Sequence, residues 1–242
     1  MSPESAPLLK VSKLVKRFGG FHALDGLSFH VSSGEILGLV GPNGSGKTTA
    51  INVISGLYAP DGGELVLDGT SIGGVASHRL VHRGVNRTFQ IPKPFLSLTV
   101  RQNVEVALAY GGAATTPPAL ADLLEEYRLA EVADRPAADL NNAQQKMLDL
   151  ARALATRPRL LLLDELAAGL NPAELDWIAE RIKALAKSGM AIIVVEHLMG
   201  FIEYITDRVI VMNAGREIFE GTLRSATHDP EVIRVFLGGA HG

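Results

Sequence analysis

Short apolar runs separated by glycine and proline turns fill the first part of the chain. They predict strands over residues 8–15, 23–31, 36–40 and, after the turn at 60–63, over 64–67. The run at 36–40 leads into a glycine-rich stretch, and apolar residues at 51, 54 and 57 then suit one face of a helix. A strand, a glycine loop and a helix are therefore expected in succession.

The pattern changes after two prolines at positions 92 and 94. Helical periodicity predicts helices over residues 99–110, 118–129 and 143–155, with a flexible loop over 111–118. These segments are expected to form a mainly helical lobe.

The strand pattern resumes with apolar runs at 160–164 and 191–195, which predict buried parallel strands. Between them, Asn171 as N-cap, Pro172 at the first helical position and Gly189 after the end delimit a helix. The tail predicts a hairpin over 209–219 and a short helix capped by Asp229.

Together these elements predict an α/β fold with a mainly parallel sheet, an N-terminal antiparallel β subdomain and an inserted α-helical lobe. Residues 1–90 and 158–242 are expected to form the core, and residues 91–157 the lobe.

Composition narrows the possible partners. The net charge is -3, the sequence pI is about 6.2, and no long run of lysine and arginine is present, so nucleic-acid binding is not expected. The apolar runs fall short of the roughly 20 residues of a membrane helix, and the N-terminus does not resemble a secretion signal. With no cysteine, disulfides are excluded. Membrane association would have to come through a protein partner.

The glycine-rich stretch after the third strand has the pattern of a phosphate-binding P-loop. Glycines let the backbone curl around an anion, Lys47 supplies a cation for the β- and γ-phosphates, and the Thr48 hydroxyl suits Mg²⁺. The stretch predicts ATP and Mg²⁺ as ligands and comprises Gly41, Pro42, Asn43, Gly44, Ser45, Gly46, Lys47, Thr48 and Thr49.

Polar residues stand at the ends of two predicted parallel strands: Asp164 and Glu165 after the first, His197 after the second. Taken singly, Asp164 is equally well explained as a helix cap and His197 as a surface histidine. A P-loop upstream favours the alternative, because a bound nucleotide needs an acidic group for Mg²⁺ and a group that orients water. Phe18, by spacing alone, is more often a core residue than a base-stacking one.

The order of these motifs resembles the nucleotide-binding subunits of ATP-binding cassette transporters over nearly the whole chain. GPNGSGKTT at 41–49 matches the family P-loop, and RTFQ at 87–90 resembles its Q-loop. LLLLDE at 160–165 resembles the Mg²⁺ strand with the catalytic glutamate, AAGLN at 167–171 the D-loop, and VVEH ending at His197 the switch histidine.

The resemblance implies a role for each matching residue. Phe18 would stack on adenine, Gln90 would sense Mg²⁺ and couple to the membrane subunit, and Asp164 would hold Mg²⁺. Glu165 would act as the general base on the attacking water, and His197 would contact the γ-phosphate.

Three phrases resemble the ATPases of branched-chain amino acid importers within this family: FGGFHAL at 18–24, AAGLNP at 167–172 and DPEVIRVFLG at 229–238. Related importers of urea or aromatic acids share similar phrases, and other subunits select the substrate.

Two positions depart from the family pattern. Leu166 follows Glu165 where the family usually has proline, a change expected to alter the turn locally. The signature Leu-Ser-Gly-Gly-Gln, which in the family caps the γ-phosphate of the partner subunit's ATP, stands here as Leu140, Asn141, Asn142, Ala143 and Gln144.

The resemblance implies a place at the cytoplasmic face of the membrane, with permease subunits, a second ATP-binding subunit and an external solute-binding protein as partners. The altered signature favours a different ATP-binding subunit over a second copy of this chain. The alternative is that asparagine and alanine simply cap the helix and are tolerated.

Three other functions compete with transport. A soluble ATPase of the same fold usually has two cassettes or a long coiled coil, which this chain lacks. A module that binds ATP without hydrolysing it is compatible with the altered signature. A P-loop kinase fits least, because a glutamate beside the Mg²⁺ strand suits the activation of water.

Overall fold

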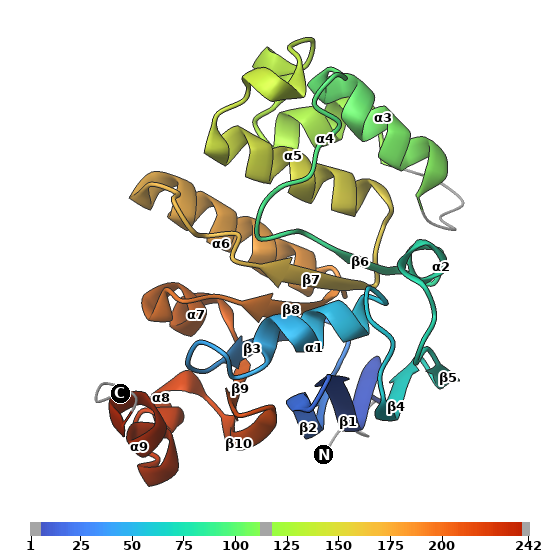
Figure 1. Cartoon of the computed structure of the whole chain (residues 1–242). Coiled ribbons are helices and arrows are strands. Elements are labelled where there is room, and N and C mark those ends of the chain that lie inside the picture. The colour runs from blue at the N-terminus through green and yellow to red at the C-terminus, as the bar shows by residue number, and fades with distance from the viewer. Residues whose placement is uncertain (1–5, 112–117, 239–242) are drawn as a thin grey trace.

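The computed structural model describes residues 6–111 and 118–238, and a pair of sheets organises these residues (Figure 1). The smaller sheet is antiparallel, in the order β2-β1-β4-β5. Its strands are β1 (Leu9–Phe18), β2 (Phe21–Val31), β4 (Gly62–Leu67) and β5 (Thr70–Ser71).

The larger sheet has the order β10-β9-β3-β8-β7-β6, and all its neighbouring strands are parallel except β10, which pairs antiparallel with β9. It contains β3 (Ile36–Val40), β6 (Val85–Arg87), β7 (Leu160–Asp164), β8 (Ala191–Val195), β9 (Arg208–Asn213) and β10 (Arg216–Gly221). The predicted parallel pair is confirmed, because Asp164 lies beside Val195 in register.

Two hydrophobic cores lie on opposite faces of the larger sheet. Because side chains alternate along a strand, Leu162 faces one core and Leu163 the other. One core packs α1 (Lys47–Ile54) between the two sheets, as Figure 1 shows. The other packs α5 (Asn142–Ala155), α6 (Pro172–Lys187) and α7 (Met199–Ile205) against the opposite face.

The helical lobe consists of α3 (Val100–Tyr110), α4 (Leu120–Glu126) and α5, with short 3₁₀ turns at Ala130–Val132 and Ala137–Asp139. The helix predicted over 118–129 is shorter than expected, because the chain leaves the α-helix at Tyr127. The helix predicted from 143 begins one residue earlier, at Asn142. Most of the predicted flexible loop, residues 112–117, lies outside the described residues.

Three helix starts are fixed by reciprocal side-chain caps, which satisfy backbone N–H groups that have no partner within the helix. The pairs are Thr99 with Gln102, Asn141 with Gln144, and Asn171 with Glu174. The Asp229 cap of α9 (Pro230–Gly238) is also confirmed. Short α2 (Ser77–Val81), α7 and α8 (Leu223–Ala226), and the strands β5 and β6, were not predicted.

Candidate functional site

The P-loop lies at the carboxyl edge of β3 and ends at the start of α1. Gly44 and Gly46 have φ angles of 78° and 105°, in the left-handed region that favours glycine. At Gly41, a Cβ atom would lie 2.2 Å from the carbonyl oxygen of Met212. Glycine is therefore required here by a close backbone contact.

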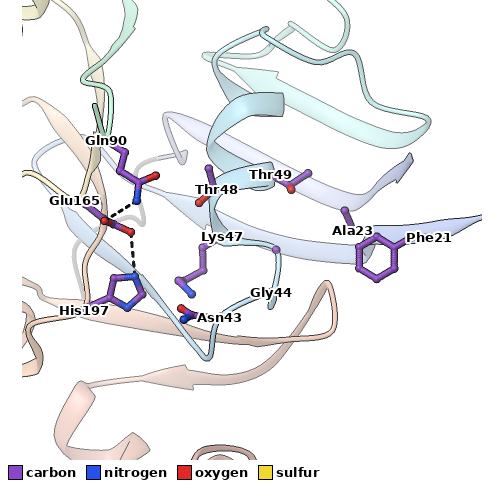
Figure 2. A pocket seen from close by; sticks show the side chains of 11 residues that line it. Phe21, Ala23, Asn43, Gly44, Lys47, Thr48, Thr49, Gln90, Glu165 and His197 are labelled. Carbon is purple, nitrogen blue, oxygen red and sulfur yellow. Dashed lines mark hydrogen bonds and ion pairs between the residues drawn. The ribbon is translucent and has the colours of Figure 1, made fainter. Parts of the chain in front are cut away.

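A cavity of about 250 Å³ opens on this loop and is lined by half of the residues predicted for the site (Figure 2). In the order of the parallel sheet, β3 is next to β8 and β8 is next to β7, so three carboxyl ends meet at one edge. The cavity is lined by Asn43, Gly44, Gly46, Lys47, Thr48, Thr49, Gln90, Glu165 and His197, together with Phe21 and Ala23.

Lys47 bends back over the P-loop. Its Nζ donates hydrogen bonds to the carbonyl oxygens of Gly41 at 2.8 Å and Pro42 at 3.0 Å. Burial lowers the pKa of Lys47, while the carboxylates of Glu165 and Asp164 oppose that shift. The loop thus holds a nearly buried cation on its own backbone, and the same ammonium group can exchange these carbonyls for phosphate oxygens.

The carboxylate of Glu165 is held between two side chains from different strand ends. Gln90 Nε2 donates to Glu165 Oε2 at 2.8 Å, and His197 Nε2 lies 3.0 Å from Glu165 Oε1, as Figure 2 shows. The Glu165 backbone has a φ of 51°, a conformation that L-residues rarely adopt. This turn directs the side chain into the cavity immediately after β7.

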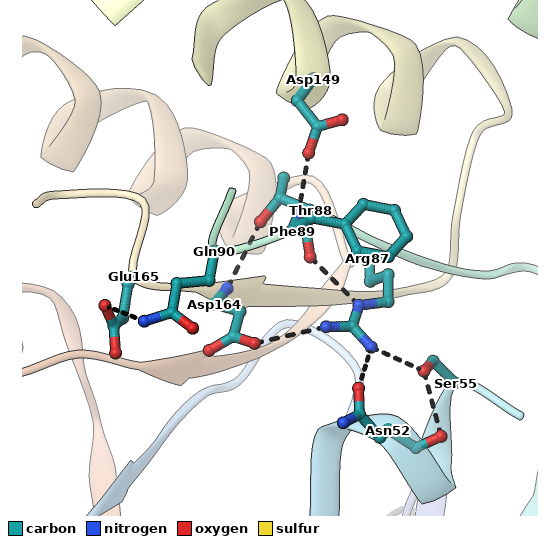
Figure 3. A network of polar contacts seen from close by, with 9 residues as sticks. All are labelled: Asn52, Ser55, Arg87, Thr88, Phe89, Gln90, Asp149, Asp164 and Glu165. Carbon is teal, nitrogen blue, oxygen red and sulfur yellow. Dashed lines mark hydrogen bonds and ion pairs between the residues drawn. The ribbon is translucent and has the colours of Figure 1, made fainter. Parts of the chain in front are cut away.

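Asp164 is 1% exposed and lies one residue before this turn. Its Oδ2 accepts a 3.3 Å contact from Arg87 Nη2, whereas Oδ1 is buried and has no hydrogen-bond partner among the described residues (Figure 3). Burial raises the pKa of Asp164, and Arg87 counteracts the shift.

An orphaned buried carboxylate oxygen fits a cation that is supplied with the nucleotide. Mg²⁺ is usually held by one or two protein groups, with water and phosphate oxygens completing the shell. Within residues 6–111 and 118–238, no three histidine, aspartate or glutamate side chains gather into a protein-only metal cage. The oxygen donors Thr48, Gln90 and Asp164 therefore fit Mg²⁺ bound to ATP better than an independent metal.

Arg87 was missed as a site residue by sequence reasoning. Its guanidinium group contacts Asp164 and donates hydrogen bonds to Asn52 on α1 and to Ser55 Oγ, the latter at 3.2 Å (Figure 3). The same group stacks on the ring of Phe89, with Cζ 4.7 Å from the ring centroid. The only sequence signal was an arginine three positions before Gln90. These contacts place a positive charge beside Asp164 and connect that strand end to the P-loop helix.

The ring of Phe18 lies outside the cavity lining. It is 46% exposed, so its interpretation as a core residue is wrong, and it packs edge-on against Tyr58 with ring centroids 5.4 Å apart. Phe21, which pairs with Phe18 across the turn between β1 and β2, lines the cavity instead. The adenine-stacking role of Phe18 stays a prediction, and Phe21 becomes a second candidate.

The altered signature does not line the cavity. Asn141 caps α5 by accepting from Gln144 N at 2.8 Å, and Gln144 Oε1 in turn accepts from Asn141 N at 3.1 Å. The Asn142 amide lies against Gly169, where a Cβ atom would be 3.0 Å from Nδ2. Residues 141–144 therefore contribute nothing to this chain's own P-loop cavity.

Comparison with known proteins agrees with this geometry. Residues 24–168 match the family model described as ABC transporter. The chain is 38% identical to the high-affinity branched-chain amino acid transport ATP-binding protein BraF of Pseudomonas aeruginosa, covering 98% of this chain and 100% of BraF. It is 37% identical to LivG of Escherichia coli K12, described in the same terms, with the same coverage.

Solved structures give the same result. A nucleotide-free ATP-binding cassette from an ABC transporter superimposes with a TM-score of 0.86 at 30% identity, covering 96% of this chain and 99% of that one. A dimeric bacterial ABC transporter cassette superimposes with a TM-score of 0.79 at 25% identity, covering 89% and 99%. The P-loop NTPase fold class expected from the sequence is confirmed.

Proposed function

The chain belongs to the ABC transporter family, whose ATP-binding cassettes are ATPases, and we propose that it energises the import of branched-chain amino acids. One observation carries the proposal: Lys47 and Glu165 line the same cavity, with Gln90 and His197 holding the Glu165 carboxylate. A phosphate-binding cation and a candidate base for water thus share one space. The substrate class rests on what BraF and LivG are described as transporting.

ATP binding is assigned to the P-loop, residues 41–49. Backbone N–H groups of this loop and the start of α1 surround the phosphates, and the helix adds its positive end. Lys47 exchanges the carbonyls of Gly41 and Pro42 for the β- and γ-phosphates, which offer stronger, charge-assisted bonds. Comparing the ATP affinities of Phe18→Ala and Phe21→Ala separates the two candidates for stacking on adenine.

Hydrolysis is assigned to Glu165, which takes a proton from the water that attacks the γ-phosphate. Gln90 and His197 keep the carboxylate facing the cavity, and His197 also contacts the γ-phosphate. Gln90 uses its amide nitrogen on Glu165, so its amide oxygen is the atom left for a cation. We assign Thr48, Gln90 and Asp164 to holding Mg²⁺, which when bound neutralises charge on the β- and γ-phosphate oxygens.

A second ATP-binding subunit is needed to complete the site. Residues 141–144 lie away from the cavity of their own chain, so they can meet ATP only on another subunit, and a similar cassette forms dimers. Asn141, Asn142 and Ala143 replace the serine hydroxyl and the close backbone approach that glycines allow. A different subunit with an intact signature would complete the site built on Lys47, Asp164 and Glu165.

Membrane partners follow from the same assignment. No helix within residues 6–111 and 118–238 combines the length and the apolar character needed to cross a bilayer. We propose that permease subunits hold the chain at the cytoplasmic face of the membrane. A solute-binding protein on the other side would deliver the amino acid.

Reconstitution tests the proposal. The chain is co-expressed with its permease subunits and a second ATP-binding subunit, and ATP-driven uptake of radiolabelled leucine into proteoliposomes is measured. We expect uptake that stops with the Glu165→Gln chain. ATPase activity without leucine uptake would mean that a different solute is transported, and failure to co-purify with any membrane subunit would favour a soluble ATPase.

A second candidate function is a cassette that binds ATP beside a more active partner. The altered signature is the observation that favours it. Steady-state phosphate release by the complex separates the two, because a pure ATP sensor would release none from the site that contains Glu165.

A further inference from the structure

Lys146 is a buried cation that the ATP-binding site as described so far does not use. It lies on α5, is 5% exposed, and points away from solvent towards the loop that follows β7. Its Nζ donates to the carbonyl oxygen of Glu165 at 2.7 Å and to that of Leu166 at 3.1 Å. An ammonium group is therefore bound to the backbone of the proposed base itself.

Glu196 holds the next residue of the same loop from the other side. It follows β8 directly, is 2% exposed, and its Oε1 accepts a 2.6 Å hydrogen bond from Ala167 N. Burial raises the pKa of Glu196 and lowers that of Lys146, and the attraction between the two groups opposes both shifts. Burying both groups costs free energy, which their contacts with the loop help to offset.

The backbone between these contacts is strained. Glu165 has a φ of 51°, and a non-glycine residue in that region is unfavourable and persists only where the surrounding structure holds it. Its N–H donates to Val195 O at 2.9 Å, so Lys146 supplies the matching contact on the carbonyl side. Leu166 follows, and leucine does not fix its own φ as proline would.

We propose that Lys146 is a positioning residue that keeps the Glu165 carboxylate aimed at the attacking water by holding the backbone of residues 165 and 166. The inference rests on the proposed function of Glu165 as the general base. Lys146 does not line the cavity, so its effect is transmitted through the peptide groups that carry the base. Because α5 begins at Asn142, the same residue also connects the helix of the altered signature to the catalytic turn.

The test compares Lys146→Met, which keeps an apolar stem of similar length but removes the terminal ammonium donors, with Lys146→Arg, which keeps the charge. In the reconstituted complex we expect Lys146→Met to lower kcat about 10- to 100-fold, the size of effect that a misplaced catalytic group produces. ATP affinity should stay within about threefold, because the P-loop is untouched, and Lys146→Arg should recover most of the activity. Arg152→Met is the matched control: it removes a cation from the same helix whose contacts are Asp149, Lys93 and Phe95.

A double-mutant cycle separates positioning from a loss of structure. Once Glu165→Gln has removed the base, adding Lys146→Met should lower the residual rate of hydrolysis by less than about twofold, because Lys146 no longer has a catalytic carboxylate to position. The proposal would be overturned if Lys146→Met lowered the rate as much in the Glu165→Gln background as it does alone. It would also be overturned if the single variant Lys146→Met kept full activity. If Lys146→Met does not fold, Lys146→Gln carries the same comparison with one shorter, uncharged donor.

The two proposals fail in different ways. Rapid turnover by Glu165→Gln alone would remove Glu165 as the base, whatever Lys146 does. A slow Glu165→Gln together with an unaffected Lys146→Met would leave the base in place and refute only the positioning role.

Discussion

The side-chain amide of Gln90 donates a 2.8 Å hydrogen bond to the carboxylate of Glu165, although 75 residues separate the two in the chain. They meet because β6 and β7 are adjacent parallel strands whose carboxyl ends lie at the same edge of the sheet. Residues 91 onwards lead from Gln90 into the helical lobe. This hydrogen bond therefore connects the segment that enters the lobe to the proposed base.

Gln90→Ala should slow hydrolysis more than it weakens ATP binding. It removes one of two side chains that orient Glu165, and a misaligned group of this kind costs up to about 100-fold in rate. ATP affinity and steady-state phosphate release are measured in the reconstituted complex. Gln102→Ala, which alters a glutamine in the cap of α3, is the control, and an equal effect of both variants would contradict the assignment.

Lys47→Ala should abolish measurable ATP binding. The change removes the side-chain cation that the P-loop places in the cavity, and charge-assisted bonds to phosphate are worth about 1.5–3 kcal/mol each. Fluorescence titration with a nucleotide analogue provides the affinity. Lys183→Ala, a lysine that lies over Tyr204, should bind ATP normally, and an unchanged affinity of Lys47→Ala would refute the P-loop assignment.

The sequence was sufficient for features that depend on local spacing. The P-loop, the parallel pair of β7 and β8, and the caps at Asn171 and Asp229 all follow from residues that are close in the chain. The gathering of Lys47, Glu165 and His197 was also predictable, because parallel strands present their carboxyl ends together.

Contacts between distant segments were not predictable in the same way. Nothing local indicates that Lys146 binds the carbonyl of Glu165, or that Arg87 joins Asp164 to α1. The position of Phe18 was missed for a similar reason: its exposure depends on how the turn between β1 and β2 meets Tyr58. Short α2, α7 and α8 carry too few periodic residues to be recognised.

The altered signature should make the chain a poor homodimer. Losing one or two charge-assisted bonds to the γ-phosphate would weaken ATP-driven closure about tenfold or more at each site. ATP-dependent dimerisation of Glu165→Gln is measured by analytical ultracentrifugation, alone and with Asn141→Ser, Asn142→Gly and Ala143→Gly added. A tight ATP-bound homodimer of the unrepaired chain, not improved by the repair, would falsify the requirement for a different partner.

Acidification should stabilise the wild-type chain relative to Glu196→Gln. Burial raises the pKa of Glu196 above its ordinary value of 4.5, so the folded state binds this proton more tightly than the unfolded state does. The contribution of Glu196 to stability is then greatest at low pH and is lost as pH rises through the raised pKa. Urea unfolding gives the free energy of unfolding of both proteins at about pH 5.5 and about pH 7.5. The stability of the wild-type chain relative to Glu196→Gln should be greater at the lower pH. A difference in stability that is the same at both pH values, or greater at the higher one, would contradict this prediction.

The most direct test of the account is the rate of phosphate release by Glu165→Gln in the reconstituted complex. Glutamine keeps the shape of the side chain and a hydrogen-bonding oxygen for His197, but it lacks the basicity of the carboxylate. We predict ATP affinity within about threefold of wild type, with hydrolysis about 10²- to 10⁴-fold slower. Turnover within a few-fold of wild type, at the same ATP affinity, would show that Glu165 is not the base.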